Sequence, residues 1–125
     1  MSIAKRMGVK RSYPVAAATS LHVNAIAVLA AGLAVGLAAA TGTEKCAGVV
    51  TFAVSNPGSN GAVRVEVEAG EHKFATTDIV AADVGATAYF VDDQTVSKSH
   101  ATNSRPIAGK IIQVDDDGVW VELGV

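Results

Sequence analysis

The chain has 125 residues, a length that fits one domain able to bury a core of its own. Half of the residues are hydrophobic but only six are aromatic, and Ala, Val and Gly are frequent, which disfavours a helical bundle packed with Leu and favours short strands and tight turns. The single cysteine, Cys46, excludes an intrachain disulfide, and we expect it to be a small buried residue in a strand.

Charge is unevenly distributed along the chain, with a basic start and an acidic remainder. Lys5, Arg6, Lys10 and Arg11 precede the first acidic residue, Glu44. The sequence therefore predicts an extended basic N-terminal arm over residues 1–14, followed by a single β domain over residues 15–125. Such an arm favours an acidic partner surface, whereas the acidic domain disfavours nucleic acid, because phosphates repel carboxylates.

Residues 21–40 form an apolar stretch that allows two interpretations. In one, the stretch is the apolar segment of a membrane-anchored or exported protein. Its Leu, Ile and Val residues favour insertion by about 4 kcal/mol in all, but His22, Asn24 and two glycines oppose it. Because that sum is marginal, we favour the second interpretation, in which residues 25–29 and 33–37 are strands joined by a turn at Gly32 and no membrane is involved.

The middle of the chain carries the clearest strand patterns. Residues 48–54 are rich in β-branched and aromatic side chains and lead into a loop at residues 56–61. Valines then alternate with charged residues over 63–68, which indicates a half-buried strand. A turn at Ala69 and Gly70 predicts that this strand forms a hairpin with residues 71–75.

The next segment predicts a short helical turn followed by a second hairpin. Residues 78–85 are expected to hold one helical turn, capped by Thr77 or Asp78 and ended by Gly85. Residues 88–91 form a strand that turns at 92–94 and returns over 95–97. Residues 100–105 form a polar loop.

The last stretch predicts a third hairpin, with strands at 107–114 and 119–123 and a turn at 115–118 in which Gly118 supplies a positive φ. Trp120 would face away from the core valines, so it either packs on the second face within the barrel or anchors a subunit interface. With about eight to ten strands and no long helix, the predicted fold class is all-β: a small barrel or sandwich of short antiparallel strands behind an extended N-terminal arm.

No pattern of residues points to catalysis, a metal or a cofactor. His22, His72 and His100 lack the spacing of a metal site, and the acidic run at 115–117 is consecutive rather than alternating as a calcium loop requires. Asp92 and Asp93 are adjacent, so in a strand they would point to opposite faces. We therefore expect a protein that is not an enzyme, with no catalytic, cofactor-binding or metal-binding residues.

Several segments resemble one family, the head-decoration or cement proteins of tailed-phage capsids. The resemblance spans residues 13–123 and is carried by order and spacing, most clearly in Ala82-Asp83-Val84-Gly85, Val91-Asp92-Asp93-Gln94-Thr95-Val96, Ile107-Ala108-Gly109-Lys110 and Val114-Asp115-Asp116-Asp117-Gly118-Val119-Trp120-Val121-Glu122. It implies a β-rich structural subunit, often a trimer, that binds the major capsid protein on the exterior of the virion after synthesis in the host cytoplasm.

Residues 1–12 lie outside that resemblance, so the role of the arm is inferred from its charge. We expect Lys5, Arg6, Lys10, Arg11 and Tyr13 to bind the capsid, and Trp120 to be a possible contact between subunits. Besides the membrane or export alternative, a small-molecule or carbohydrate-binding β module is a third hypothesis. The sequence offers it few aromatic residues for stacking on a sugar.

Overall fold

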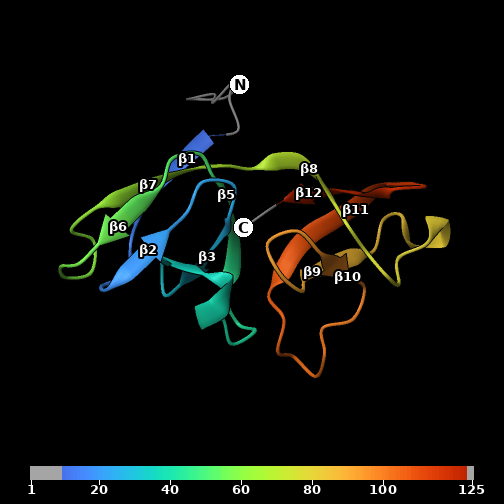
Figure 1. Ribbon diagram of the computed structural model, residues 1–125. Coiled ribbons are helices and arrows are strands. Elements are labelled where there is room, and N and C mark those ends of the chain that lie inside the picture. Colours follow the sequence, from blue (N-terminus) through green and yellow to red (C-terminus); the bar gives the residue numbers. More distant parts are fainter. Residues whose placement is uncertain (1–9, 124–125) are drawn as a thin grey trace, which may run out of the picture.

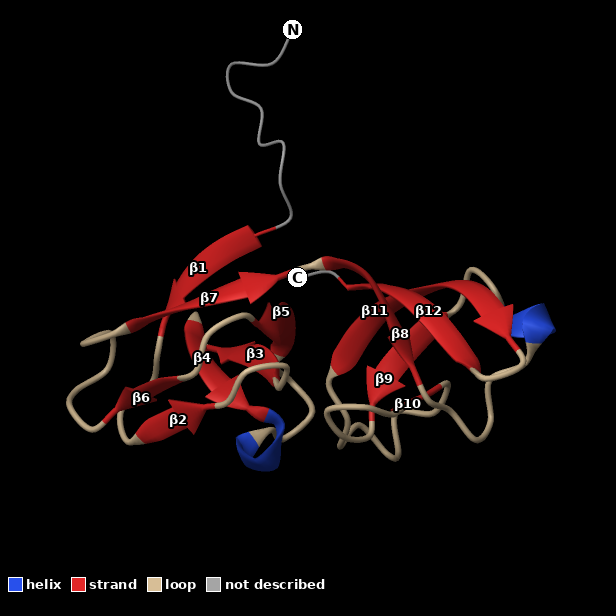
Figure 2. Ribbon diagram, turned by 45° about the horizontal axis from the view of Figure 1, so that its top comes forward, coloured by secondary structure: helices blue, strands red, loops and turns tan. Residues whose placement is uncertain are grey.

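A computed structural model describes residues 10–123 and shows an all-β protein of three antiparallel sheets (Figures 1 and 2). The first sheet has the order β1 (Lys10–Pro14), β7 (Arg64–Glu68), β5 (Lys45–Val50), β3 (Ile26–Ala30) and β4 (Leu33–Gly36). The second has the order β10 (Val96–Ser97), β9 (Thr87–Phe90), β11 (Ile107–Asp115), β12 (Gly118–Leu123) and β8 (Gly70–Phe74). A small sheet pairs β2 (Thr19–Leu21) with β6 (Val54–Asn56), and the 3-10 turns are η1 (Leu37–Ala39) and η2 (Ala81–Asp83).

Of the two predicted all-β architectures, the structure is a sandwich and not a closed barrel. Each five-stranded sheet curls until its edges meet at one isolated parallel bridge, Val15 with Ala34 in the first and Ala75 with Thr95 in the second. One bridge does not make a ladder, so both sheets remain open. The all-β prediction is confirmed, with twelve short strands in residues 10–123.

The two large sheets have the same topology, so the chain contains an internal structural repeat. When the strands of each sheet are numbered along the chain, both have the order first, fifth, fourth, second, third, with all neighbours antiparallel. We call residues 10–69 the first half and residues 70–123 the second half. Figure 2 shows the two halves side by side, joined where β7 leads into β8.

Local details of the repeat match at the same positions, 61 residues apart. The second and fourth strands of both sheets shift register at a bulge next to a glycine of positive φ, Gly48 (φ 142°) in the first half and Gly109 (φ 156°) in the second. A Cβ on either glycine would collide with a carbonyl oxygen of the fifth strand, at 2.7 Å from Glu68 and 1.9 Å from Glu122. Both halves therefore require glycine at this bulge.

A substitution at the bulge tests how tightly the sheet holds this geometry. Gly109→Ala forces a Cβ into the Glu122 carbonyl and a side chain into a left-handed backbone, so we expect a loss of about 2 kcal/mol or more in the free energy of unfolding. The matched control is Gly58→Ala, because Gly58 lacks a positive φ and its added Cβ would lie 3.5 Å from Ala62. Urea denaturation that gives the two variants equal stability would contradict the assignment.

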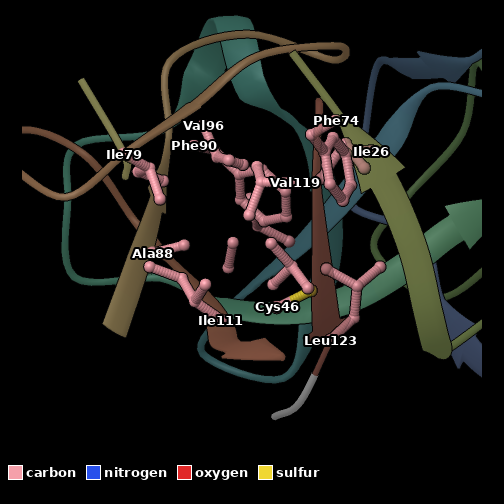
Figure 3. Packing of buried hydrophobic residues seen from close by; sticks show 13 residues of the cluster. Ile26, Cys46, Phe74, Ile79, Ala88, Phe90, Val96, Ile111, Val119 and Leu123 are labelled. Carbon is pink, nitrogen blue, oxygen red and sulfur yellow. The ribbon is translucent and has the colours of Figure 1, made fainter. Parts of the chain in front are cut away.

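The strands β3 and β5 are buried on both faces, and this joins the two halves. Their inward side chains, Ala27 and Ala47, belong to the core of the first half. Their outward side chains, Ile26, Val28 and Cys46, are at most 1% exposed and pack with residues of the second sheet such as Phe74 and Leu123 (Figure 3). The first half thus covers the open side of the second sheet and completes its core.

The predicted strands of the apolar stretch are confirmed. Residues 21–40 contain β3, β4 and η1, and Ala31 and Gly32 form the turn, both with positive φ. Two-sided burial explains why this stretch reads as almost continuously apolar rather than alternating. Within residues 10–123 the structure has no helix long and apolar enough to cross a membrane.

The predicted hairpin between residues 63–68 and 71–75 is wrong. β7 pairs with β1 and β5 in the first sheet, while β8 pairs with β12 in the second. Gly70, with φ 82°, lets the chain pass from one sheet to the other instead of folding back. The turn signal at Ala69 and Gly70 is real, but it marks the boundary between the halves.

Two smaller expectations also need correction. The helical turn exists as η2 and Gly85 follows it with a positive φ, but neither Thr77 nor Asp78 caps it. Instead the Asp83 carboxylate accepts a hydrogen bond from the Val80 backbone N–H, and Asp78 accepts one from the Ser97 hydroxyl. Gly118 lacks the expected positive φ, and a Cβ there would lie 2.8 Å from the Phe74 carbonyl oxygen, so close strand approach explains this glycine.

Candidate interaction surface

The predicted arm ends in a strand of the first sheet. Lys10, Arg11 and Tyr13 lie in β1 and pair with β7, while Lys5 and Arg6 lie outside the described residues. Lys10 is exposed and its ammonium lies 3.9 Å from the Glu66 carboxylate. Arg11 is partly buried, and the partly buried Tyr13 packs against the core of the first half.

β1 is an edge strand, and this shapes what the arm residues can do. Its one ladder partner is β7, and beyond Tyr13 the chain continues into the buried Val15. Arg64 of β7 donates hydrogen bonds to the hydroxyl and the carbonyl of Ser12, both at 2.9 Å. Residues 10–14 are therefore held in the sheet and are not part of an extended arm.

The second sheet presents a broad face that points away from the core. On β8, β9 and β12 the outward side chains alternate with buried residues of the second core, and on β11 Ile107 and Lys110 lie outward on either side of a bulge. The outward set includes Glu71, Lys73, Thr87, Tyr89, Ile107, Lys110, Trp120 and Glu122. We call these residues the outer face of the second sheet. It contains the only tryptophan of the chain, placed outward as the sequence predicts.

Trp120 is fixed in place by polar neighbours on this face. Its indole N–H donates a hydrogen bond of 3.0 Å to a carboxylate oxygen of Asp115, and the Lys73 ammonium lies 5.9 Å from the ring centroid. Lys73 in turn pairs with Asp117 at 2.5 Å. A partly buried aromatic side chain held rigidly in this way loses little conformational entropy when it binds a partner.

The charged neighbours of Trp120 favour their ionised forms. Hydrogen bonds from the Gln113 amide and the Trp120 indole hold the pKa of Asp115 below its ordinary value. The hydrogen bond with Lys73 lowers the pKa of Asp117, and the same contact raises the pKa of Lys73. Because all three groups are exposed to solvent, these contacts orient side chains more than they stabilise the fold.

Fluorescence of the single tryptophan reports this network. Acid protonates Asp115 and weakens its charge-assisted bond to the indole, so we expect an emission change with a midpoint below pH 3.8, the ordinary pKa, because hydrogen bonds hold that pKa down. Asp115→Asn keeps an acceptor oxygen but does not titrate, and should lack the transition. Circular dichroism must show intact strands over the same range. An emission midpoint at or above pH 3.8 would contradict this role of Asp115. The same emission change in the Asp115→Asn variant would also contradict it.

Other polar clusters of the described residues serve the fold. Burial raises the pKa of Glu44, but hydrogen bonds from the backbone N–H groups of Thr41 and Gly42 and from the Thr41 hydroxyl outweigh it, so the pKa is lowered overall. Gly42 lies against the backbone of Asn103, with no space for a Cβ. Glu44 therefore orders a loop that touches the polar 100–105 loop of the second half.

An open cleft of about 500 Å³ lies where the turn at residues 91–93 meets the first half. Asp93 anchors that turn by accepting a 2.9 Å hydrogen bond from the Ile26 backbone N–H. The lining includes Leu21, His22, Leu37 and Asp92, and within the described residues it contains no Phe, Tyr or Trp. A sugar would find no aromatic ring to stack on here, so this cleft does not favour the carbohydrate-binding hypothesis.

The histidines and acidic residues that the sequence analysis considered as possible ligands are spread over the molecule. His22 lines the cleft and His72 lies on β8. The His100 ring contacts the Tyr89 ring edge-on, with 5.8 Å between the ring centroids. Within residues 10–123 no three His, Cys, Asp or Glu side chains are grouped as a metal site. Asp92 caps its own turn by accepting from the Gln94 N–H, while Asp93 reaches the first half.

Sequence analysis singled out Trp120 but missed most of its face. Tyr89 and Ile107 are neighbours in the β9–β11 pairing, and Glu71 lies opposite Glu122 across β8 and β12. The predicted strands included these residues, but the order of strands was needed to bring them together on one face. The assignment of β8 to a hairpin with β7 hid its pairing with β12.

Comparisons with known proteins found no matching family model, no similar curated protein and no similar solved structure.

Proposed function

We propose that the chain is a structural, non-enzymatic interaction protein that decorates a tailed-phage capsid. In this proposal it binds the major capsid protein on the exterior of the head, stabilises the shell and associates with further copies of itself. It would be made in the host cytoplasm and carried on the virion. The resemblance in sequence suggests this function, and the arrangement of charges and exposed aromatic residues is compatible with it.

The observation that carries the proposal is a basic segment attached to the edge of an otherwise acidic sheet structure. Lys5 and Arg6 precede β1, while the rest of the chain has more acidic than basic residues. A charged segment ahead of a rigid domain can spread contacts over a wide partner surface, and its ordering cost is repaid when many copies bind a repeating lattice.

The alternative of a membrane-anchored or exported protein is less favoured. It relied on residues 21–40 as one apolar segment, and those residues are divided between β2, β3, β4 and η1. Ile26 and Val28 are covered by the second half, so their apolar character has a packing explanation. No second function is favoured by a specific observation.

Deletion of the charged segment tests the proposed role of the arm. The deletion should remove residues 1–9 only, because residues 10–14 pair with β7 and their loss would damage the first sheet. We expect the shortened chain to keep its thermal midpoint while its occupancy on phage capsids that bind the full-length chain falls at least about tenfold, because several charge contacts are lost. Occupancy is measured by electron microscopy of the particles.

A charge-only control separates electrostatics from length. Lys5→Gln with Arg6→Gln keeps the segment but removes two cations, and it should reproduce much of the loss, which should also weaken as salt is added. Full occupancy of either variant would reject the role of the arm. Failure of the wild-type chain to bind any capsid would reject the decoration function itself.

A further inference from the structure

The internal repeat allows the same sheet face to be compared in two settings. The register at the bulge makes Ile26, Val28 and Cys46 of the first half equivalent to Thr87, Tyr89 and Ile107 of the second. In the first half these residues are at most 1% exposed because the second sheet covers them. In the second half the equivalent face is open, and Ile107 is 49% exposed.

This open face carries side chains typical of a protein interface. Tyr89 and Ile107 are adjacent across β9 and β11. Trp120 lies on the same face, two strands from Tyr89. Tyr and Trp are enriched at the centres of interfaces, where they supply large apolar contacts at a small entropic cost.

Two carboxylates of the face, Glu71 and Glu122, are direct neighbours. Glu71 lies directly opposite Glu122 across β8 and β12, a like-charge pair that destabilises a sheet. At the equivalent position of the first half, Lys10 lies opposite Glu68. Among the described residues, no cation lies within 4 Å of the carboxylate of Glu71 or Glu122 in an ion pair.

Two cations lie on or just before β11. Lys110 of the central strand β11 lies directly opposite Glu122 of β12, and Arg105 lies just before β11, whereas Glu71 lies one strand further away, on β8. Neither cation forms an ion pair with a carboxylate in the described part of the chain. Among these unpaired groups the carboxylates therefore lie toward β8 and the cations toward β9, whereas Lys73 of β8 is already paired with Asp115 and Asp117.

A second copy turned by a two-fold rotation matches this pattern. The rotation places the β8 side of one face over the β9 side of the other, so that Glu71 and Glu122 meet the partner's Lys110 and Arg105, and each contact occurs twice. The occupant of the equivalent face in the first half is itself a five-stranded sheet of this chain, which packs there with its core-facing side.

We propose that the outer face of the second sheet is a two-fold docking surface for a second copy of this chain. Tyr89, Ile107 and Trp120 anchor the contact, and Glu71 with Lys110 sets its orientation. This surface would account for the self-association that is part of the proposed function. The docking proposal itself is based on the internal repeat and on the charges of the face. The mass of the chain in solution tests the docking proposal without any capsid. The docking proposal can therefore fail while the decoration function stands, and the decoration function can fail while the chain still forms a dimer.

The mass of the full-length chain in solution tests the proposal. Light scattering after size exclusion should give twice 12.7 kDa at micromolar concentration. Ile107→Lys should give a monomer, because a charge at an exposed position costs one copy little but would be buried at the centre of the pair. The matched control is Phe52→Lys, since Phe52 is 68% exposed but lies in the first half, and it should remain a dimer.

A charge swap tests the orientation. Glu71→Lys and Lys110→Glu should each raise the dissociation constant about tenfold or more, equivalent to 1.4 kcal/mol. The double variant exchanges the two charges and should recover most of the wild-type affinity, which general damage to the fold would not allow. Thermal midpoints confirm that each variant is folded.

Several results would overturn the proposal. A monomeric wild-type chain at all concentrations would exclude the contact, and a mass of three chains would exclude the two-fold arrangement. Equal effects of Ile107→Lys and Phe52→Lys would remove the assignment to this face. A wild-type monomer whose capsid occupancy is lost on Ile107→Lys would assign the face to the capsid protein instead of a second copy.

Discussion

The outward side of β3 and β5 is the constraint on which the rest of the structure depends. Ile26, Val28 and Cys46 belong to one sheet but fill the core of the other, so the first half must be apolar on both faces at these strands. The first half closes its own core with the small β2–β6 sheet, through Leu21 and Val54. The second half has no such pair in the described residues and relies on the first half instead. Two similar units thereby form one cooperative structure.

This constraint also explains which predictions succeeded from the sequence. Alternation alone placed Val65 and Val67 inward, and the turns at Gly32 and at residues 115–118 gave correct hairpins, because these signals are local. The prediction of an all-β chain needed nothing more. The apolar stretch resembled a membrane segment because periodicity cannot distinguish burial on two sides by protein from burial in lipid. Only the contact between the halves resolves it.

What the sequence could not give is the order of strands and everything that depends on it. The turn at Gly70 looked like a hairpin because local chemistry does not reveal which sheet a strand will join. The repeat is also hidden, since the equivalent residues Val28 and Tyr89, or Cys46 and Ile107, differ in type. Their differences carry the functional argument: positions that are fully buried in the first half bear the partly buried Tyr89 and the exposed Ile107 in the second. The candidate site was therefore predictable only at Trp120.

Hydrogen exchange measured by mass spectrometry tests the dependence of the second half on the first most directly. Val28→Ala removes two methyl groups from the contact between the halves and should cost about 2 kcal/mol. If the first half completes the second core, exchange should accelerate in β9, β11 and β12, far from the substitution in sequence, while β1 and β7 remain protected. Acceleration confined to β3, β4 and β5 would contradict the account, because it would mean that the second half holds its core without the first.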